Sequence, residues 1–292
     1  MSNITLFTTL LFYAVFIGQI YFLSYYFPRK VRDRMKQVME CYPPRDYPKL
    51  YPKPLEYYAK FHRNYELMNQ VLLLGGIILM FVMAYWGTLS GREISEVIPW
   101  AYFMLQMGPL MWVEFSEFSC FKKMRQADLR TKKTANLQPR RLFDVISPLL
   151  FSVVVLFFLT GVFFSLYINN FDYQWGGKAF LNIAIITSGN LFFAGIIYWN
   201  LYGKKLDPYQ TSEDRIRLIK ITVKSLAFVS IGVSIFMMAS QAINVFELDI
   251  LEPVSMSIYL QLLAFASIGA RLQALPVEDF NFDVYKADAP VA

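Results

Sequence analysis

Residues 148–168 read PLLFSVVVLFFLTGVFFSLYI, a run without a single charged side chain. An α-helix rises about 1.5 Å per residue, so roughly 20 helical residues cross a hydrocarbon core about 30 Å thick. The apolar residues are continuous and do not alternate with polar ones, which excludes the strands of a transmembrane β-barrel. This segment therefore predicts a membrane-spanning α-helix.

Six further segments are also long and apolar enough to cross a bilayer, although the one at residues 98–118 carries two glutamates, and the composition of the whole chain agrees with them. Apolar residues make up 56% of the 292 residues and charged residues 17%, with a mean hydropathy of +0.37. A soluble domain has roughly 45–50% apolar and about 25% charged residues, so disorder, a disulfide scaffold and an ordinary soluble enzyme are excluded. We expect an all-α, polytopic membrane helix bundle with seven transmembrane helices, at residues 4–27, 71–89, 98–118, 148–168, 179–202, 225–246 and 254–270.

The positions of lysine and arginine predict how the chain enters the membrane. Of the 28 basic residues, 26 fall in four segments, namely 28–70, 122–147, 203–224 and 271–292. Only Arg92 and Lys178 lie elsewhere. Because basic loops stay in the cytoplasm, we expect these four segments inside, the N-terminus outside and the C-terminus inside. We place the protein in the inner, cytoplasmic membrane of a bacterium.

We expect two parts, a single seven-helix domain over residues 1–275 and an acidic tail over residues 276–292. Apolar stripes at helical spacing continue from several spans into the cytoplasmic segments, which predicts a collar of helix extensions. Residues 41–54 contain five prolines and predict polyproline II, either as a docking segment for a partner or as a stiff connector. In the tail, alternating apolar residues predict either an extended segment on the basic face or a frayed terminus.

Two carboxylates in the third predicted span form the first candidate site. Glu114 and Glu117 are three residues apart and share one helix face. Ionisable groups within a membrane mark functional sites by default, so this pair predicts binding of a cation or transfer of protons. The alternative is that both glutamates neutralise the basic residues that follow them.

Amide side chains in four predicted spans form the second candidate site. Amides hydrogen-bond across helix interfaces in membranes, and the same groups can line a polar substrate path. Together with Glu114 and Glu117, these amides predict one central polar cluster. The amides are Gln106, Asn182, Asn190, Gln241, Asn244 and Gln261.

Two pairs of adjacent basic residues lie at predicted span ends, where phosphate headgroups begin. Arg140 with Arg141 and Lys204 with Lys205 predict contacts to an anionic lipid or to a partner. Each basic group near an anionic surface contributes about 1 kcal/mol. The alternative is that these residues only set the orientation of the chain.

Several classes of chemistry are excluded by what the chain lacks. One histidine and two cysteines do not build a Cys/His zinc cage or a bis-His haem site within one chain, so we expect no metal and no other cofactor. The net charge of +6 follows from the basic loops, so we expect no nucleic-acid partner. No phosphate-binding loop or hydrolase motif occurs, and no catalytic residue is assigned. The last predicted span has no lysine for a retinal Schiff base.

Three hypotheses for function follow. The first is a non-enzymatic accessory, assembly or binding bundle, with the lipid bilayer, anionic lipids or another membrane or cytoplasmic protein as partner. The second is a small transporter or channel that uses the amide cluster. The third is a membrane-embedded transferase at the inner interface, which a cavity with converging acids and bases would favour.

Overall fold

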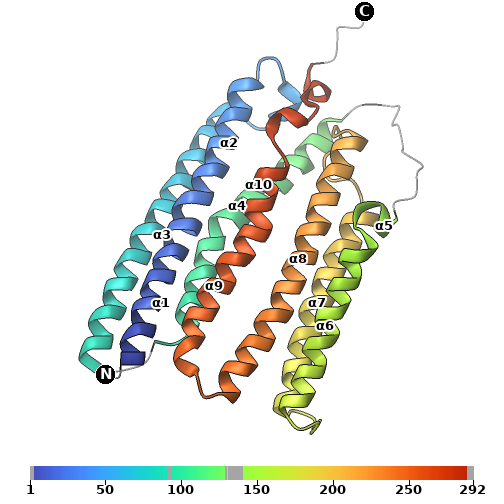
Figure 1. Cartoon of the computed structure of the whole chain (residues 1–292). Helices are drawn as coiled ribbons and strands as arrows, with labels where there is room; N and C mark the ends of the chain where they lie inside the picture. The colour runs from blue at the N-terminus through green and yellow to red at the C-terminus, as the bar shows by residue number, and fades with distance from the viewer. Residues whose placement is uncertain (1–2, 91–93, 129, 131–140, 288–292) are drawn as a thin grey trace, which may run out of the picture.

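The computed structural model describes residues 3–90, 94–128, 130 and 141–287, and every regular element in them is helical (Figure 1). The longer helices are α1 (Asn3–Tyr21), α2 (Phe27–Cys41), α3 (Leu55–Ser90), α4 (Val97–Ala127), α6 (Pro148–Ile168), α7 (Lys178–Tyr202), α8 (Ser212–Val245) and α9 (Glu252–Ala264). The shorter elements are α5 (Leu142–Val145), α10 (Ala270–Ala274), the π-helical turns η1 (Phe22–Tyr26) and η4 (Phe265–Gly269), and the 3-10 turns η2 (Pro48–Leu50), η3 (Asp249–Leu251), η5 (Val277–Asp279) and η6 (Phe282–Tyr285). For these residues the predicted all-α class is confirmed.

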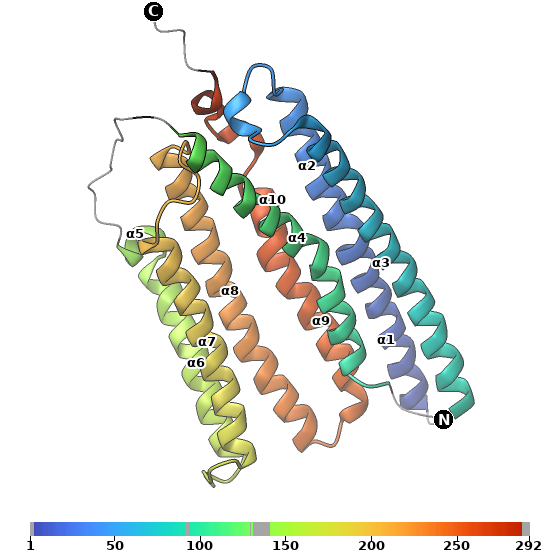
Figure 2. The same ribbon diagram turned by 180° about the vertical axis from the view of Figure 1, so that it is seen from behind.

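The long helices lie side by side, and the chain begins at one end of the bundle and finishes at the other (Figures 1 and 2). The segments α1, η1 and α2 follow one another without a break, and so do α9, η4 and α10. Loops 42–54 and 203–211 lie at the end where the chain finishes (Figure 1). This end also holds the end of α4 with Lys122, Lys123 and Arg125, and we call it the basic end.

Six helices are long and apolar enough to cross a membrane, judged by their length and composition. They are Leu6–Cys41, Leu55–Gly87, Pro148–Ile168, Lys178–Tyr202, Ser212–Val245 and Asp249–Ala274. Helix α4 covers the remaining predicted span, residues 98–118, but is not among the six, because its prolines, amide and glutamates lower its hydropathy. It packs beside α3 and α9 (Figure 2). The chain is thus a multi-pass helical membrane protein by composition, and a seventh span stays a prediction.

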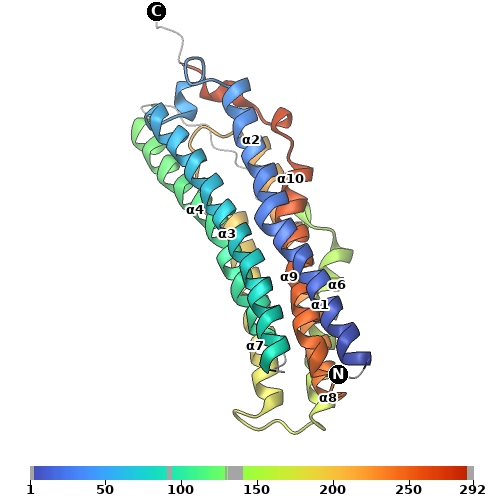
Figure 3. The same cartoon turned by 90° about the vertical axis from the view of Figure 1, so that its left-hand side faces the viewer.

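The bundle has two parts. Helices α6, α7 and α8 pack against one another, while α1, α3, α4 and α9 form the second part. Contacts between α8 and α9 join them. Seen from the side, α3 and α4 lie on one side of the second part and α1 with α9 on the other (Figure 3). The boundary between the two parts therefore brings together helices from distant regions of the sequence.

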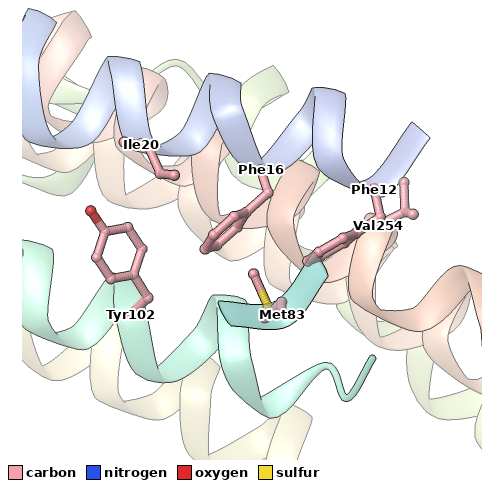
Figure 4. Close-up of a cluster of buried hydrophobic side chains, with 6 residues drawn as sticks. All are labelled: Phe12, Phe16, Ile20, Met83, Tyr102 and Val254. Atoms are coloured by element: carbon pink, nitrogen blue, oxygen red, sulfur yellow. The ribbon is translucent and has the colours of Figure 1, made fainter. Parts of the chain in front are cut away.

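Aromatic residues of α1 form the core of the second part (Figure 4). Phe12 and Phe16 project from α1 toward Met83 of α3 and Tyr102 of α4. These side chains are at most 6% exposed, and the rings of Phe16 and Tyr102 lie 5.6 Å apart. Burial of an aromatic side chain stabilises a core by several kcal/mol in water, but within lipid the same contacts stabilise mainly through dispersion and close packing.

Gly76 of α3 explains how α4 can approach α3 so closely. A Cβ atom at this position would overlap the hydroxyl oxygen of Tyr102. That hydroxyl donates a hydrogen bond to the Leu72 carbonyl at 2.8 Å and lies 3.0 Å from the Ser24 hydroxyl. The absence of a side chain at residue 76 therefore lets Tyr102 reach the backbone of α3.

Residues 276–287 of the tail fold back onto the basic end instead of fraying. Val277 and Tyr285 are buried, and the ring of Phe282 stacks on Tyr42 of loop 42–54 at 3.9 Å. Arg217 of α8 forms a 3.2 Å ion pair with Asp279. The predicted contact with the basic face is present, but the backbone forms the turns η5 and η6 rather than an extended segment, because the Asn281 side chain accepts a hydrogen bond from the Asp283 amide and caps η6.

Loop 42–54 contains the 3-10 turn η2 where the prolines predicted polyproline II. Its aromatic residues pack on the tail, which agrees with the connector interpretation of this segment. The predicted helix extensions are present, since α2 continues to Cys41, α3 begins at Leu55 and α8 begins at Ser212.

Candidate functional site

The first group of buried amides joins α1, α4 and α9. Gln19 donates hydrogen bonds to the Pro99 carbonyl at 3.0 Å and to Gln106 at 3.2 Å, and its own oxygen accepts one from Ser257 at 2.7 Å. Gln106 donates to Ser24 at 2.8 Å. Gln19, Gln106 and Ser257 are at most 1% exposed, so this network is closed and its groups satisfy one another.

The remaining predicted amides lie elsewhere. Asn182 donates to Gln241 at 3.1 Å, which links α7 to α8. Asn190 accepts a hydrogen bond from Ser230 between the same two helices. Asn244 donates to Glu252 at 2.8 Å near the opposite end of the bundle. Gln261 donates to the Val15 carbonyl at 3.0 Å.

The amides therefore divide among three helix interfaces, α1 with α4 and α9, α7 with α8, and α8 with α9, instead of forming one central cluster among the described residues. The sequence reasoning missed Gln19, Ser24 and Ser257, although each is a polar residue within an apolar span. A polar residue within an apolar span is the sequence feature that points to these three residues.

A cavity of about 520 Å³ lies at the basic end, between the two parts of the bundle. Its walls come from α2, α4, the end of α7, the start of α8 and the continuous α9–α10 segment, and Phe280 of the tail also borders it. Glu114 and Glu117 both line it, as their spacing on one helix face predicts. The charged residues around it are Arg34, Glu114, Glu117, Lys204, Asp207, Arg215 and Arg271.

Some of these charges are already engaged by neighbours. Glu114 forms an ion pair with Arg271 at 3.3 Å. Arg215 donates to the Gly203 carbonyl at 2.6 Å. Asp207 accepts hydrogen bonds from the Tyr209 amide at 2.8 Å and from the Tyr285 hydroxyl. These contacts hold the wall of the cavity in place.

Three other charges are available to a ligand. Arg34, Glu117 and Lys204 line the cavity, and none forms a hydrogen bond or ion pair with any other residue that the structure describes. Arg34 and Glu117 lie within electrostatic range of each other but not in contact. The cavity thus presents two cations and one carboxylate without direct partners.

The fold places Lys204 and Lys205, one of the two predicted basic pairs, in different surroundings. Lys204 lines the cavity, whereas Lys205 points into the loop and donates to the Pro208 carbonyl at 3.1 Å. Burial in this loop lowers the pKa of Lys205, although nearby Asp207 opposes the effect. Arg141 is exposed before α5, and Arg140 lies outside the described residues.

Two smaller cavities lie away from these charges. An apolar cavity of about 420 Å³ lies between α6, α7 and α8, with Asn190 and Ser230 among its polar lining residues. A cavity of about 210 Å³ lies beside η1 and α3 and is bordered by Arg32, Glu66 and Tyr65. Arg32 and Glu66 form an ion pair at 2.8 Å, so the charges of this cavity are already paired.

Among the described residues, no group of three or more His, Cys, Asp and Glu side chains is arranged to hold a metal ion.

No protein-family model, no curated protein and no solved structure matches the chain.

Proposed function

We propose that this protein is a non-enzymatic membrane bundle whose cavity at the basic end binds the phosphate headgroup of a lipid. One observation carries the proposal, namely that Arg34 and Lys204 line a 520 Å³ cavity without direct partners among the described residues. Guanidinium and ammonium groups are the usual protein partners of phosphate oxygens. Lipid binding of this kind suits an accessory or assembly role beside another membrane or cytoplasmic protein.

The predicted topology supports this placement. We propose that α4 is the seventh membrane pass and that the basic end faces the cytoplasm, because the loops at this end carry the excess of lysine and arginine. The cavity then lies at the depth of the inner-leaflet headgroups. A bacterial inner membrane remains the localisation that we predict.

The test is the lipid content of the protein after purification in mild detergent. We replace Arg34→Gln and Lys204→Gln together and measure bound phospholipid per protein by mass spectrometry. Two cations at about 1 kcal/mol each correspond to roughly 30-fold weaker lipid binding. The matched control, Lys60→Gln with Lys220→Gln, removes the same charge from exposed positions at the basic end that do not line the cavity.

Loss of lipid in the cavity variant but not in the control supports the proposal. Equal lipid content in the wild type and the cavity variant contradicts it. Proteins that copurify with the wild type are identified in the same experiment, and their loss from the cavity variant would connect lipid binding with assembly.

The transferase hypothesis is the second candidate, and Glu117 favours it. A carboxylate without an ion-pair partner can act as a general base when it faces a bound substrate, and acids and bases do converge in this cavity. Incubation of the protein with labelled lipids tests for a modified headgroup. The transporter hypothesis has weaker support, since the closed hydrogen bonds of Gln19 and Gln106 favour a packing role for these amides.

A further inference from the structure

Glu117 is the charge that a simple phosphate site does not need. A carboxylate in the wall of such a site repels the phosphate and lowers its affinity. Glu114, one helical turn earlier on the same face, is held by Arg271, whereas Glu117 has no contact of this kind with a described residue. The cavity therefore contains a carboxylate that its own cations do not engage directly.

The three available charges define the ligand that complements them. Arg34 and Lys204 offer two positive groups, and Glu117 offers one negative group; they lie on α2, on the loop after α7 and on α4, around one cavity. A ligand with a phosphate alone complements only the cations. A ligand that also carries an ammonium group complements all three residues.

We propose, resting on the proposed function, that the headgroup bound in this cavity carries a primary amine as well as a phosphate. Arg34 and Lys204 contact the phosphate, and Glu117 accepts hydrogen bonds from the ammonium group. Glu117 is then a specificity-determining residue, because a headgroup without an amine leaves its carboxylate facing the phosphate unpaired. The phosphoethanolamine headgroup is the simplest member of this class.

The alternative role for Glu117 is to neutralise the arginines near it. Arg34 and Arg271 are both within electrostatic range of Glu117. However, neither forms an ion pair with it, and Arg271 already pairs with Glu114. In that alternative, replacing Glu117 would change affinity for all phosphate headgroups in the same direction and would not change the preference among them.

The experiment titrates the full-length protein in detergent with phosphatidylethanolamine and phosphatidylglycerol of identical acyl chains. The wild type is expected to bind phosphatidylethanolamine about tenfold more tightly, since one charge-assisted contact separates the two lipids. In Glu117→Gln this preference should disappear, through weaker binding of phosphatidylethanolamine and unchanged or tighter binding of phosphatidylglycerol. Glu213→Gln is the matched control, because it removes the same charge from an exposed position of α8 that does not line the cavity.

The wild-type comparison alone tests the inference if the variant does not fold. Equal affinity for the two lipids, or tighter binding of phosphatidylglycerol, overturns the amine requirement but leaves phosphate binding intact. Failure of the wild type to bind either lipid overturns the proposed function itself. Free phosphoethanolamine is added as a competitor, and displacement of the lipid by it at comparable concentration would assign the same chemistry to a water-soluble ligand, whereas no displacement supports the lipid.

Discussion

The hydroxyl of Tyr285 donates a hydrogen bond to the carboxylate of Asp207, a residue 78 positions earlier in the chain. Tyr285 lies in the tail and Asp207 in the loop between α7 and α8, and both are buried. The carboxylate also accepts hydrogen bonds from two backbone amides of its loop, those of Tyr209 and Gln210. The tail is therefore attached to the wall of the cavity by a buried polar contact.

The first prediction is that Tyr285→Phe releases the tail. The substitution keeps the ring but leaves the Asp207 carboxylate with one donor fewer, which costs about 1–3 kcal/mol for a buried charged acceptor. We expect faster proteolysis between residues 276 and 287 and a lower melting temperature. Tyr167→Phe, at an exposed ring whose hydroxyl is far from the tail, serves as the control and should change neither quantity. An unaltered digestion pattern in Tyr285→Phe would show that the hydroxyl does not hold the tail.

The second prediction concerns alkaline pH. Burial, and secondarily the Asp207 carboxylate, raise the pKa of Tyr285 well above its usual value of about 10. A group whose pKa is raised on folding stabilises the folded state below its unfolded pKa and loses that contribution as pH rises through the folded value.

Docking of the tail should therefore be independent of tyrosine ionisation up to about pH 10 and weaken above it. Proteolysis of the tail between pH 9 and pH 11 measures this dependence. Tyr285→Phe has no ionisable hydroxyl, so its additional loss of protection above pH 10 should be smaller than that of the wild type. A parallel dependence in both proteins would assign the effect to other groups.

The third prediction compares two adjacent glycines of α3. Gly76→Ala places a Cβ atom against the Tyr102 hydroxyl, whereas Gly75→Ala places it in open space. Overpacking of this kind costs about 1–3 kcal/mol. Alanine also favours a helix over glycine by up to about 1 kcal/mol, so Gly75→Ala should be neutral or stabilising. Thermal unfolding in detergent checks both variants, and equal melting temperatures would contradict the close approach of α3 and Tyr102.

The fourth prediction tests the seven-pass topology. Reporters fused near residues 130, 210 and 285 should lie in the cytoplasm, and a reporter near residue 172 should lie outside. If α4 does not cross the membrane, a reporter near residue 95, just before α4, falls on the same side as the reporter near residue 130, just after it. That result would remove the seventh span.

The sequence predicts the position of each helix better than it predicts which helices pack against one another. The span at residues 148–168 coincides with α6, because Pro148 suits a first helical turn and the Ser147 side chain caps it by accepting the Leu150 amide. Residues 179–202 correspond to α7 with a difference of one residue. These boundaries depend on local hydropathy and capping, which a single sequence contains.

The candidate site depends on packing that a single sequence does not contain. The shared helix face of Glu114 and Glu117 was predictable from their spacing, but Arg271, 157 residues after Glu114, pairs with it only because α9, which continues into α10, packs beside α4. Arg34 reaches the same cavity from α2. The tail also differs from its period-two pattern, because the Asn281 cap and the buried Tyr285 favour a turn.

The hydrogen bond between Gln19 and Ser257 spans 238 residues, and this has a consequence for biosynthesis. A chain is synthesised from its N-terminus, so α1 enters the membrane long before α4 and α9 exist. Until then Gln19 has neither Gln106 nor Ser257 as a partner, and an unpaired amide in hydrocarbon costs several kcal/mol. The first helix must therefore remain beside the insertion machinery, or hold water at Gln19, until the last helix arrives to complete its polar contacts.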